Sequence, residues 1–388
     1  MKRCYSPITR LALIWIFLIF VIGCSADKDV SLLDEALIGN PYDGMWQDIA
    51  EPPFQFVLEQ TFGVEEEPAE EILASLGQLT SDREGNIYML EGRANQLVSF
   101  DSAGKFRWRV GREGEGPGEF MNAWGVVWNG EDQLFISNQR GARLEVFDTL
   151  GRFIRSHSIS ELGYRNARFV GVLDPGRLVM TVANQDMAVF GISVIVITVG
   201  DEILLEFQID IDQAEGVEFP EGSSSNSHVS VLNGEIVVAH PSKYQFDFYG
   251  AAGDSIRTVT RAMEDLVRPG IMDMNGMRGV RFFSNLYAPV RVGKEYYLVY
   301  ASWPTNIDDP DDFTNKIISR EAPDIETART YDLYDQNWRL LYSWPDDGDV
   351  REGPRGISHS DGSGLLYSST RAGFPQLGQY RVEVNPPR

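Results

Sequence analysis

The residue types that could support chemistry are spread thinly along this chain. Four histidines, His157, His228, His240 and His359, are separated widely, and none forms the His-x-x-x-His spacing that holds a metal on a helix. A metal site would therefore need histidines and carboxylates that the fold gathers from several distant segments. No Gly-x-Ser-x-Gly motif is present, so the nucleophile turn of many serine hydrolases is not predicted.

Two further segments could hold an ion. The glycine-rich segment 111–120 exposes backbone amides, but it lacks the Gly-Lys-Ser/Thr ending of a phosphate loop and carries three glutamates, so a linker between strands is the preferred interpretation. The acidic run 308–312 offers the oxygen ligands that Ca²⁺ prefers, without the spacing of an EF-hand. We expect a solvated loop there, with calcium as the alternative, and no other cofactor.

The net charge of the chain makes some classes of binding partner less suitable than others. The 388 residues include 57 acidic and 34 basic side chains, for a formal charge of −23. Such a balance disfavours nucleic acid and anionic lipid surfaces as partners bound through a general basic field. A hydrophobic fraction of 43% is typical of a globular protein rather than a disordered one.

The N-terminus has the pattern of an export signal. Lys2, Arg3 and Arg10 precede an apolar run over 11–22 that is too short to span a bilayer. The four residues from Val21 to Cys24, which include the last two of this run, resemble the lipobox of bacterial lipoproteins.

That resemblance implies cleavage before Cys24, acylation of this cysteine, and a lipid anchor in the cell envelope. Ser25 favours the outer membrane, with the protein facing the periplasm or the exterior. We therefore expect a signal peptide over 1–23 and a tether over 24–53. Cleavage would also remove Cys4, which leaves no cysteine for a disulfide or a thiol nucleophile, and would leave a formal charge of −26.

A repeat predicts the fold. Residues 82–106 align with residues 129–153 at a constant offset of 47, without a gap. Each unit contains short strand patterns separated by turns of Gly, Asn and Asp, and four strands in about this length are typical of a β-propeller blade. Weaker copies of the second strand bring the number of units to six.

Ring closure supports one domain over 54–388. The last unit has room for three strands before the chain ends, while residues 54–63 form a strand pattern ahead of the first unit. We expect this N-terminal strand to complete the sixth blade, which removes an open edge. The predicted fold class is all-β, a six-bladed β-propeller with an N-terminal strand closing the last blade.

Three motifs are similar to those of the NHL-repeat and related six-bladed propeller lipoproteins. They are Gly85-Asn86-Ile87-Tyr88, the segment 98–106, and the connector 111–120 with its Gly-Pro-Gly-Glu-Phe ending. The resemblance implies the fold but no single activity, because propellers host many functions. Lactonase-type propellers, which hold a divalent cation in the channel with Glu, Asn and Asp, make a metal-dependent hydrolase the alternative, with Asn122, Asp174 and Asn226 as candidates.

Cations are predicted to gather on one face. In a propeller the turn between the second and third strands shares a face with the connectors between blades, around the channel mouth. The basic residues in these turns are Arg93, Arg140, Arg143, His240, Lys243 and Arg371. We expect them to bind an acidic saccharide, a carboxylate or a loop of an envelope protein. The function predicted from the sequence is therefore a lipid-anchored binding module, and the residues seen require no catalysis.

Overall fold

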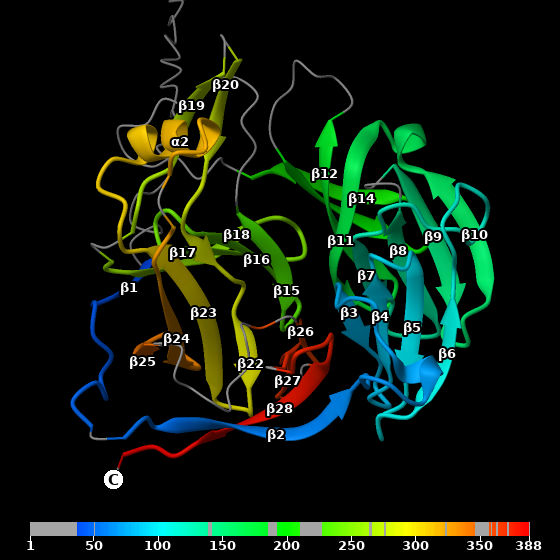
Figure 1. Ribbon diagram of the computed structural model, residues 1–388, viewed down its shortest axis with the longest axis horizontal. Helices are drawn as coiled ribbons and strands as arrows, with labels where there is room; N and C mark the ends of the chain where they lie inside the picture. Colours follow the sequence, from blue (N-terminus) through cyan, green and yellow to red (C-terminus); the bar gives the residue numbers. More distant parts are fainter. Residues whose placement is uncertain are drawn as a thin grey trace, which may run out of the picture. The chain divides into compact units, whose positions relative to one another are not determined.

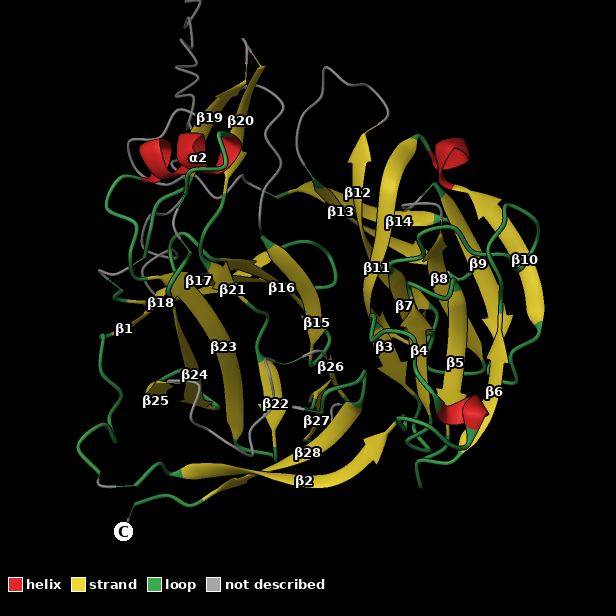
Figure 2. Cartoon of the chain, viewed as in Figure 1, coloured by secondary structure: helices red, strands yellow, loops and turns green. Residues whose placement is uncertain are grey.

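Strands form almost all of the regular structure in this protein. The computed structural model describes residues 37–49, 51–138, 142–184, 192–209, 227–263, 266–274, 277–322, 324–345, 357, 359–361, 364–370 and 372–387. Six antiparallel sheets follow one another along the chain and lie around a common centre, as Figures 1 and 2 show. The predicted six-bladed β-propeller is confirmed.

The first three blades each have four strands. The first blade contains β3 (Leu79–Ser81), β4 (Ile87–Glu91), β5 (Gln96–Phe100) and β6 (Phe106–Val110). The second contains β7 (Gly125–Trp128), β8 (Gln133–Asn138), β9 (Arg143–Asp148) and β10 (Phe153–Ser158). The third contains β11 (Tyr164–Asp174), β12 (Arg177–Asn184), β13 (Ser193–Thr198) and β14 (Ile203–Gln208). Short 3-10 turns lie at Ala69–Glu71 and Ile159–Leu162.

The other three blades carry additions. The fourth contains β15 (His228–Leu232), β16 (Glu235–His240), β17 (Gln245–Tyr249) and β18 (Ser255–Arg261), with β1 (Leu37–Asn40) added outside β18. The fifth contains β21 (Asn285–Leu286), β22 (Val290–Val292), β23 (Tyr296–Pro304), β24 (Thr327–Asp335) and β25 (Leu340–Pro345). The sixth contains β26 (His359–Ser360), β27 (Leu365–Ser369), β28 (Leu377–Val384) and β2 (Phe54–Phe62).

Side-chain caps explain why the repeat is visible in the sequence. One carboxylate oxygen of Asp101 accepts from the backbone N–H groups two and four residues later, at 3.0 and 2.8 Å. Asp148, which is 47 residues further on, makes the same pair of bonds at 3.0 and 2.8 Å. Asn129 and Asp335 cap their turns in the same way. A side-chain oxygen at a fixed place therefore caps these turns, and in the third blade the hydroxyl of Thr198 does so instead of a carboxylate or an amide.

The two chain ends close the ring, as predicted. Strand β2 pairs with β28 from Phe54 opposite Val384 to Phe62 opposite Leu377. Gly63 and Gly111 both follow the outer strand of their blade at φ 91°, and a Cβ on them would clash with Leu73 and Phe120 respectively. The two glycines thus form the same left-handed turn after the outer strands of their blades.

The cores lie between neighbouring blades. Met89 and Val98 of the first blade pack with Phe62 and Tyr367 of the sixth, while Ile136 of the second packs with Tyr88 and Leu90 of the first. The other clusters join the remaining neighbouring blades, so each blade buries its two faces against two neighbours and no blade is left with an uncovered face.

The N-terminal segment packs on the outside of two blades. Strand β1 pairs in parallel with β18, and the compact unit begins at Ala36, ahead of the predicted boundary at residue 54. The side chain of Asn40 bonds the backbone of Thr260, Trp338 and Leu340 at 2.7 to 3.1 Å. Residues 37–49 of the predicted tether therefore lie against the fourth and fifth blades, whereas 24–36 lie outside the described residues.

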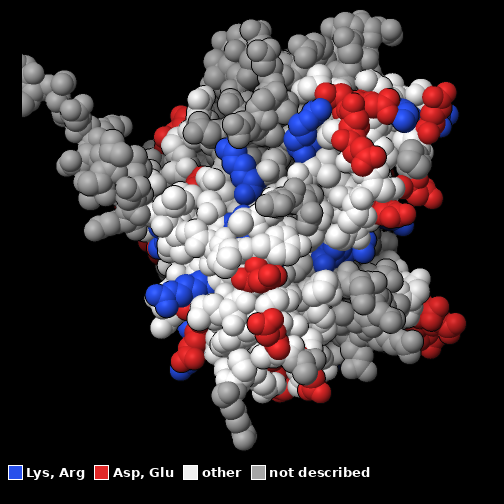
Figure 3. Space-filling view, turned by 90° about the vertical axis from the view of Figure 1, so that its left-hand side faces the viewer, with Lys and Arg blue, Asp and Glu red and all other residues white. Residues whose placement is uncertain are grey.

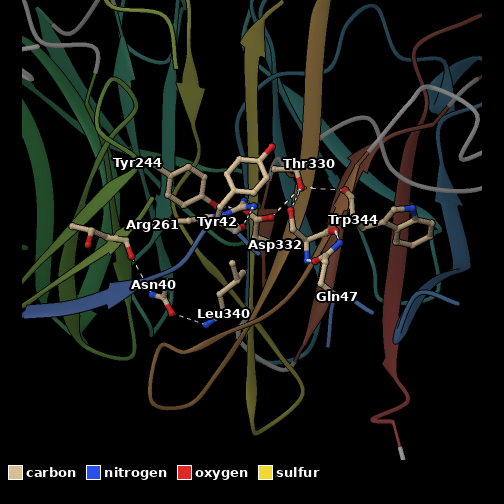
Figure 4. Close-up of polar contacts among 11 residues, drawn as sticks. Asn40, Tyr42, Gln47, Tyr244, Arg261, Thr330, Asp332, Leu340 and Trp344 are labelled. Carbon is tan, nitrogen blue, oxygen red and sulfur yellow. Dashed lines mark hydrogen bonds and ion pairs between the residues drawn. The ribbon is translucent and has the colours of Figure 1, made fainter. Parts of the chain in front are cut away.

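A buried ion pair lies beside this segment (Figure 4). Arg261 of β18 and Asp332 of β24 are 5% and 0% exposed, with Nη1 and Oδ2 2.6 Å apart. Asp332 also accepts from Thr330 Oγ1 at 2.9 Å and from the Tyr244 hydroxyl. Arg261 donates two further bonds to the carbonyl of Tyr42, at 3.0 and 2.6 Å. The network thus joins the two blades to the N-terminal segment.

The acidic run 308–312 is a helix start rather than the expected solvated loop. Helix α2 (Pro310–Ile318) lies in the insertion between β23 and β24, beside the hairpin of β19 (Gly270–Met274) and β20 (Met277–Arg281). Asp309 caps it by accepting from the N–H groups of Asp311 and Asp312. Asp311 pairs with Arg268 at 3.0 Å and Asp312 pairs with Lys316, so three of the acidic side chains already have partners. Among the described residues, no helix is long and apolar enough to cross a membrane.

Candidate functional site

A cavity runs along the centre of the ring. It has a volume of about 840 Å³ and is lined from all six blades, mostly by the innermost strands β3, β7, β11, β15, β22 and β26. Each of these strands begins at a connector between blades, because the four strands of a blade alternate in direction. The first residues of the inner strands therefore lie nearest the connector face.

Basic side chains line this cavity. They are Arg165 and Arg168 on β11, His228 on β15, Arg291 on β22 and His359 on β26. No Asp or Glu is among the described residues that line it. On the outer side seen in Figure 3, by contrast, acidic and basic side chains lie in small separate groups. Of the three arginines, Arg165 and Arg168 lie in the first half of β11, so positive charge lies toward the connector face.

Arg168 carries a charge that no carboxylate compensates. Arg168 is exposed to the cavity, and its guanidinium donates hydrogen bonds to one neutral group, Gln78 Oε1, at 3.3 and 3.4 Å. These surroundings lower the pKa of Arg168 through burial. The nearby protein thus removes part of the solvation of the charged guanidinium. An anion bound beside it would offset this loss through charge-assisted hydrogen bonds.

His228 lies near Arg168, on the neighbouring inner strand β15. Gly171 of β11 packs against Val231 of β15, and Arg168 and His228 each lie three residues before these contacts. The His228 ring stacks on Tyr287 with centroids 5.2 Å apart. Burial, and then the positive charge of Arg168, lower the pKa of His228, so the imidazole is neutral at pH 7.

Spare hydrogen-bonding groups lie in the same wall. Nε2 of His228 and Oγ of Ser230 are buried and have no hydrogen-bond partner among the described atoms. Such unsatisfied groups are uncommon in folded proteins and cost free energy unless something pairs with them. Both residues line the cavity beside Arg168.

The other side of the cavity has a histidine that stays neutral. Nε2 of His359 lies 3.0 Å from Ser81 Oγ, and the ring lies 5.7 Å from that of Tyr367. Burial lowers the pKa of His359 to about 4. It therefore contributes a polar group to the wall but no charge near neutral pH.

Trp124 supplies an apolar surface near the connector face. It is 39% exposed, and its Nε1 donates to the carbonyl of Ala167 at 3.0 Å. The ring is thus fixed next to the residue that precedes Arg168 in the chain. A flat apolar group could pack on Trp124 while an attached anion reaches Arg168.

The predicted turn residues do not form one cluster in the described part of the chain. Arg93 and Lys243 are exposed in the turns of the first and fourth blades. Arg140, Arg371 and the lipidation residue Cys24 lie outside the described residues.

Arg143 and His240 have partners within the protein. Arg143 pairs with the buried Glu145 at 2.6 Å and with Ser156 Oγ at 2.9 Å. His240 is 4% exposed, with Nδ1 3.1 Å from Ser227 Oγ and Nε2 2.9 Å from Asp247. These contacts give both residues a role in holding their blades.

The carboxylate-lined channel of the alternative hypothesis is not seen in the described residues. Asp174 lies at the far end of β11, where it pairs with Arg177. Asn122 lies in the connector ahead of β7, and Asn226 is outside the described residues. No three of the described His, Cys, Asp and Glu residues lie close enough together to hold a metal ion.

Sequence reasoning missed Arg165, Arg168 and Gln78. They lie at the starts of inner strands, where the repeat is weakest, because side chains that face the channel have no packing partner to restrict them. Their position in the sequence could have identified them, because a basic or amide residue that soon follows a connector between blades is expected to line the channel.

The fold has relatives among solved structures. A Bacteroides fragilis protein described as exported is 10% identical, with a TM-score of 0.58 over 90% of this chain and 100% of that one. A member of the DUF4221 family from Bacteroides vulgatus is 10% identical, with a TM-score of 0.54 over 85% and 99%. No family model and no curated protein matches the sequence. At such identities the likeness shows the fold alone.

Proposed function

We propose that this protein is a binding module of the bacterial cell envelope that takes an anionic ligand into its central channel. The observation that carries this proposal is the basic lining of the cavity, without a carboxylate among its described residues, in a chain of formal charge −23. A local positive field inside a negative protein both attracts and orients an anion.

The mouth residues predicted from the sequence extend this proposal. Arg93 and Lys243 are exposed in turns on the connector face, where they would steer an anion toward the channel. An acidic saccharide, a carboxylate or a carboxylate-bearing loop of an envelope protein would satisfy the same field. We also propose that the blades are related to NHL repeats, as the motifs at 85–88, 98–106 and 111–120 indicate.

Binding can be tested with a matched pair of probes. We expect benzenesulfonate to bind in titration calorimetry at low ionic strength, and benzylammonium, which has the same ring and the opposite charge, not to bind. The reason is that the described residues lining the cavity offer three guanidinium groups and no carboxylate. Equal affinity for the two probes, or stronger binding of the cation, would contradict the proposal.

We also propose that Cys24 anchors the protein to a membrane, most consistently the outer membrane. The supports are the lipobox pattern and a similar fold in a protein described as exported. Changing Cys24 to Ala is expected to shift the protein from the membrane fraction to the soluble fraction, and metabolic labelling with a fatty acid should be lost as well. Unchanged labelling and membrane association in this variant would remove the anchor assignment.

A further inference from the structure

The cavity wall formed by β11 and β15 contains the guanidinium of Arg168 and two buried polar atoms, one on the titratable ring of His228 and one on Ser230. Arg168 has only neutral Gln78 as its hydrogen-bond partner, while Nε2 of His228 and Oγ of Ser230 have none among the described atoms. Elsewhere in the lining, His359 has a partner in Ser81 and Trp124 offers an apolar ring.

We infer that Arg168 anchors the anionic group of the channel ligand, and that His228 takes up a proton when that anion binds. This inference rests on the proposed function. The ligand class that it names is a compound with a compact anionic group, such as a carboxylate, sulfonate or phosphate, because a guanidinium fork matches two oxygens of such a group.

The proton uptake follows from electrostatics across the two strands. In the free protein the nearby positive charge of Arg168 and burial both oppose a second positive charge on His228. An anion on Arg168 neutralises that field and adds an attraction for the imidazolium, so the charged form becomes favourable. No direct bond from Nε2 to the anion is needed for this effect, although a small turn of the ring would create one.

Few other charged groups can act on His228. The charged and titratable residues that line its cavity are Arg165 and Arg168 from β11, Tyr287 from the segment ahead of β22, and Arg291 on β22. Behind β15, His240 of β16 lies 3.1 Å from Ser227 Oγ and is paired with Asp247. His359 lines the cavity from β26 and is neutral near pH 7, because burial lowers its pKa to about 4. Ala239 lies opposite His228 on β16 and carries no charge.

The sign of the pH dependence is fixed by this scheme. The pKa of His228 is below its ordinary value in the free protein and higher in the complex, so the complex binds more protons. Affinity therefore rises as pH falls through the pKa of the complex and levels off below the pKa of the free protein. One proton allows a change of at most about tenfold per pH unit in that window.

Benzenesulfonate is a suitable probe, because its own charge is constant over this range. We expect its affinity in the wild-type protein to increase about tenfold or more between about pH 7.5 and about pH 5.5. Calorimetry in buffers of different ionisation enthalpy should show proton uptake on binding. His228→Asn should still bind the probe but without the pH dependence, whereas His157→Asn, at an outer strand, should keep it.

Three outcomes would overturn the inference. Affinity that does not change with pH, or pH dependence that persists in His228→Asn, removes the proton uptake while leaving binding in the channel intact. Failure of the wild-type protein to bind benzenesulfonate at either pH removes the proposed function as well. Circular dichroism and thermal unfolding of each variant, measured alongside, separate a binding defect from a folding defect.

Discussion

Replacing Arg168 with Met should weaken benzenesulfonate binding by about tenfold to a hundredfold at pH 7. The methionine keeps most of the aliphatic stem but removes a guanidinium that faces the cavity without a carboxylate partner. Because no ion pair between described residues is broken and Arg168 is exposed to the cavity, we expect the free energy of unfolding to stay nearly the same.

A matched control is available on the surface. Arg152 is exposed in the turn between β9 and β10, on the opposite side from the connectors, and its change to Met removes the same charge from the protein. Titrations of both variants at equal ionic strength should separate the local contact from the net charge. Equal losses in both variants would show that the channel has no special role.

Changing Asp332 to Ala should destabilise the fold by about 3–5 kcal/mol. Arg261 would keep its charge in a buried position, and its Nη1 would lose an acceptor at 2.6 Å. Burial alone would lower the pKa of Arg261, but the charge of Asp332 outweighs it and raises that pKa, so the two groups depend on each other. Urea unfolding followed by tryptophan fluorescence measures the loss.

The double variant separates the buried pair from its parts. Arg261→Met with Asp332→Leu leaves no buried charge, so it should be clearly more stable than Asp332→Ala alone. Asp312→Ala is a suitable control, because Asp312 pairs with Lys316 on the exposed side of α2 and should have little effect. A double variant as unstable as Asp332→Ala would show that packing, rather than the unpaired charge, sets the cost.

The propeller could be predicted because each blade repeats the same local solutions. The capped turns at Asp101 and Asp148 need an acidic side chain, a fixed spacing and a following glycine, and these leave a visible offset of 47. Ring closure was also predictable, since an orphan strand at 54–63 and a missing strand at the C-terminus imply each other.

The packing of the N-terminal segment could not be predicted in this way. Asn40 bonds backbone groups that lie 220 to 300 residues away along the chain, and a single strand of four residues carries no period. Asp309, in the acidic run, acts as a helix cap, and the sequence alone did not distinguish such a cap from a solvated loop. The partners of Asn40 are distant in the sequence, and the role of Asp309 depends on the helix formed by the insertion.

The channel residues escaped prediction for a physical reason. Core positions recur because they pack against a neighbouring blade, but Arg168 and His228 face a cavity in which nothing limits their type. Turn positions such as Arg93 could be predicted because the repeat shows where the turn between the second and third strands lies. The candidate site in the structure therefore lies in the wall of the channel, whereas the sequence predicted it in the turns on the connector face.

The most direct test is a diffraction experiment on crystals soaked in selenate, whose selenium gives an anomalous signal. The account predicts a selenate ion inside the channel beside Arg168 and within reach of His228, and its loss from crystals of Arg168→Met. Selenate bound only at exposed turns such as Arg93 and Lys243, with an empty channel under the same conditions, would contradict it.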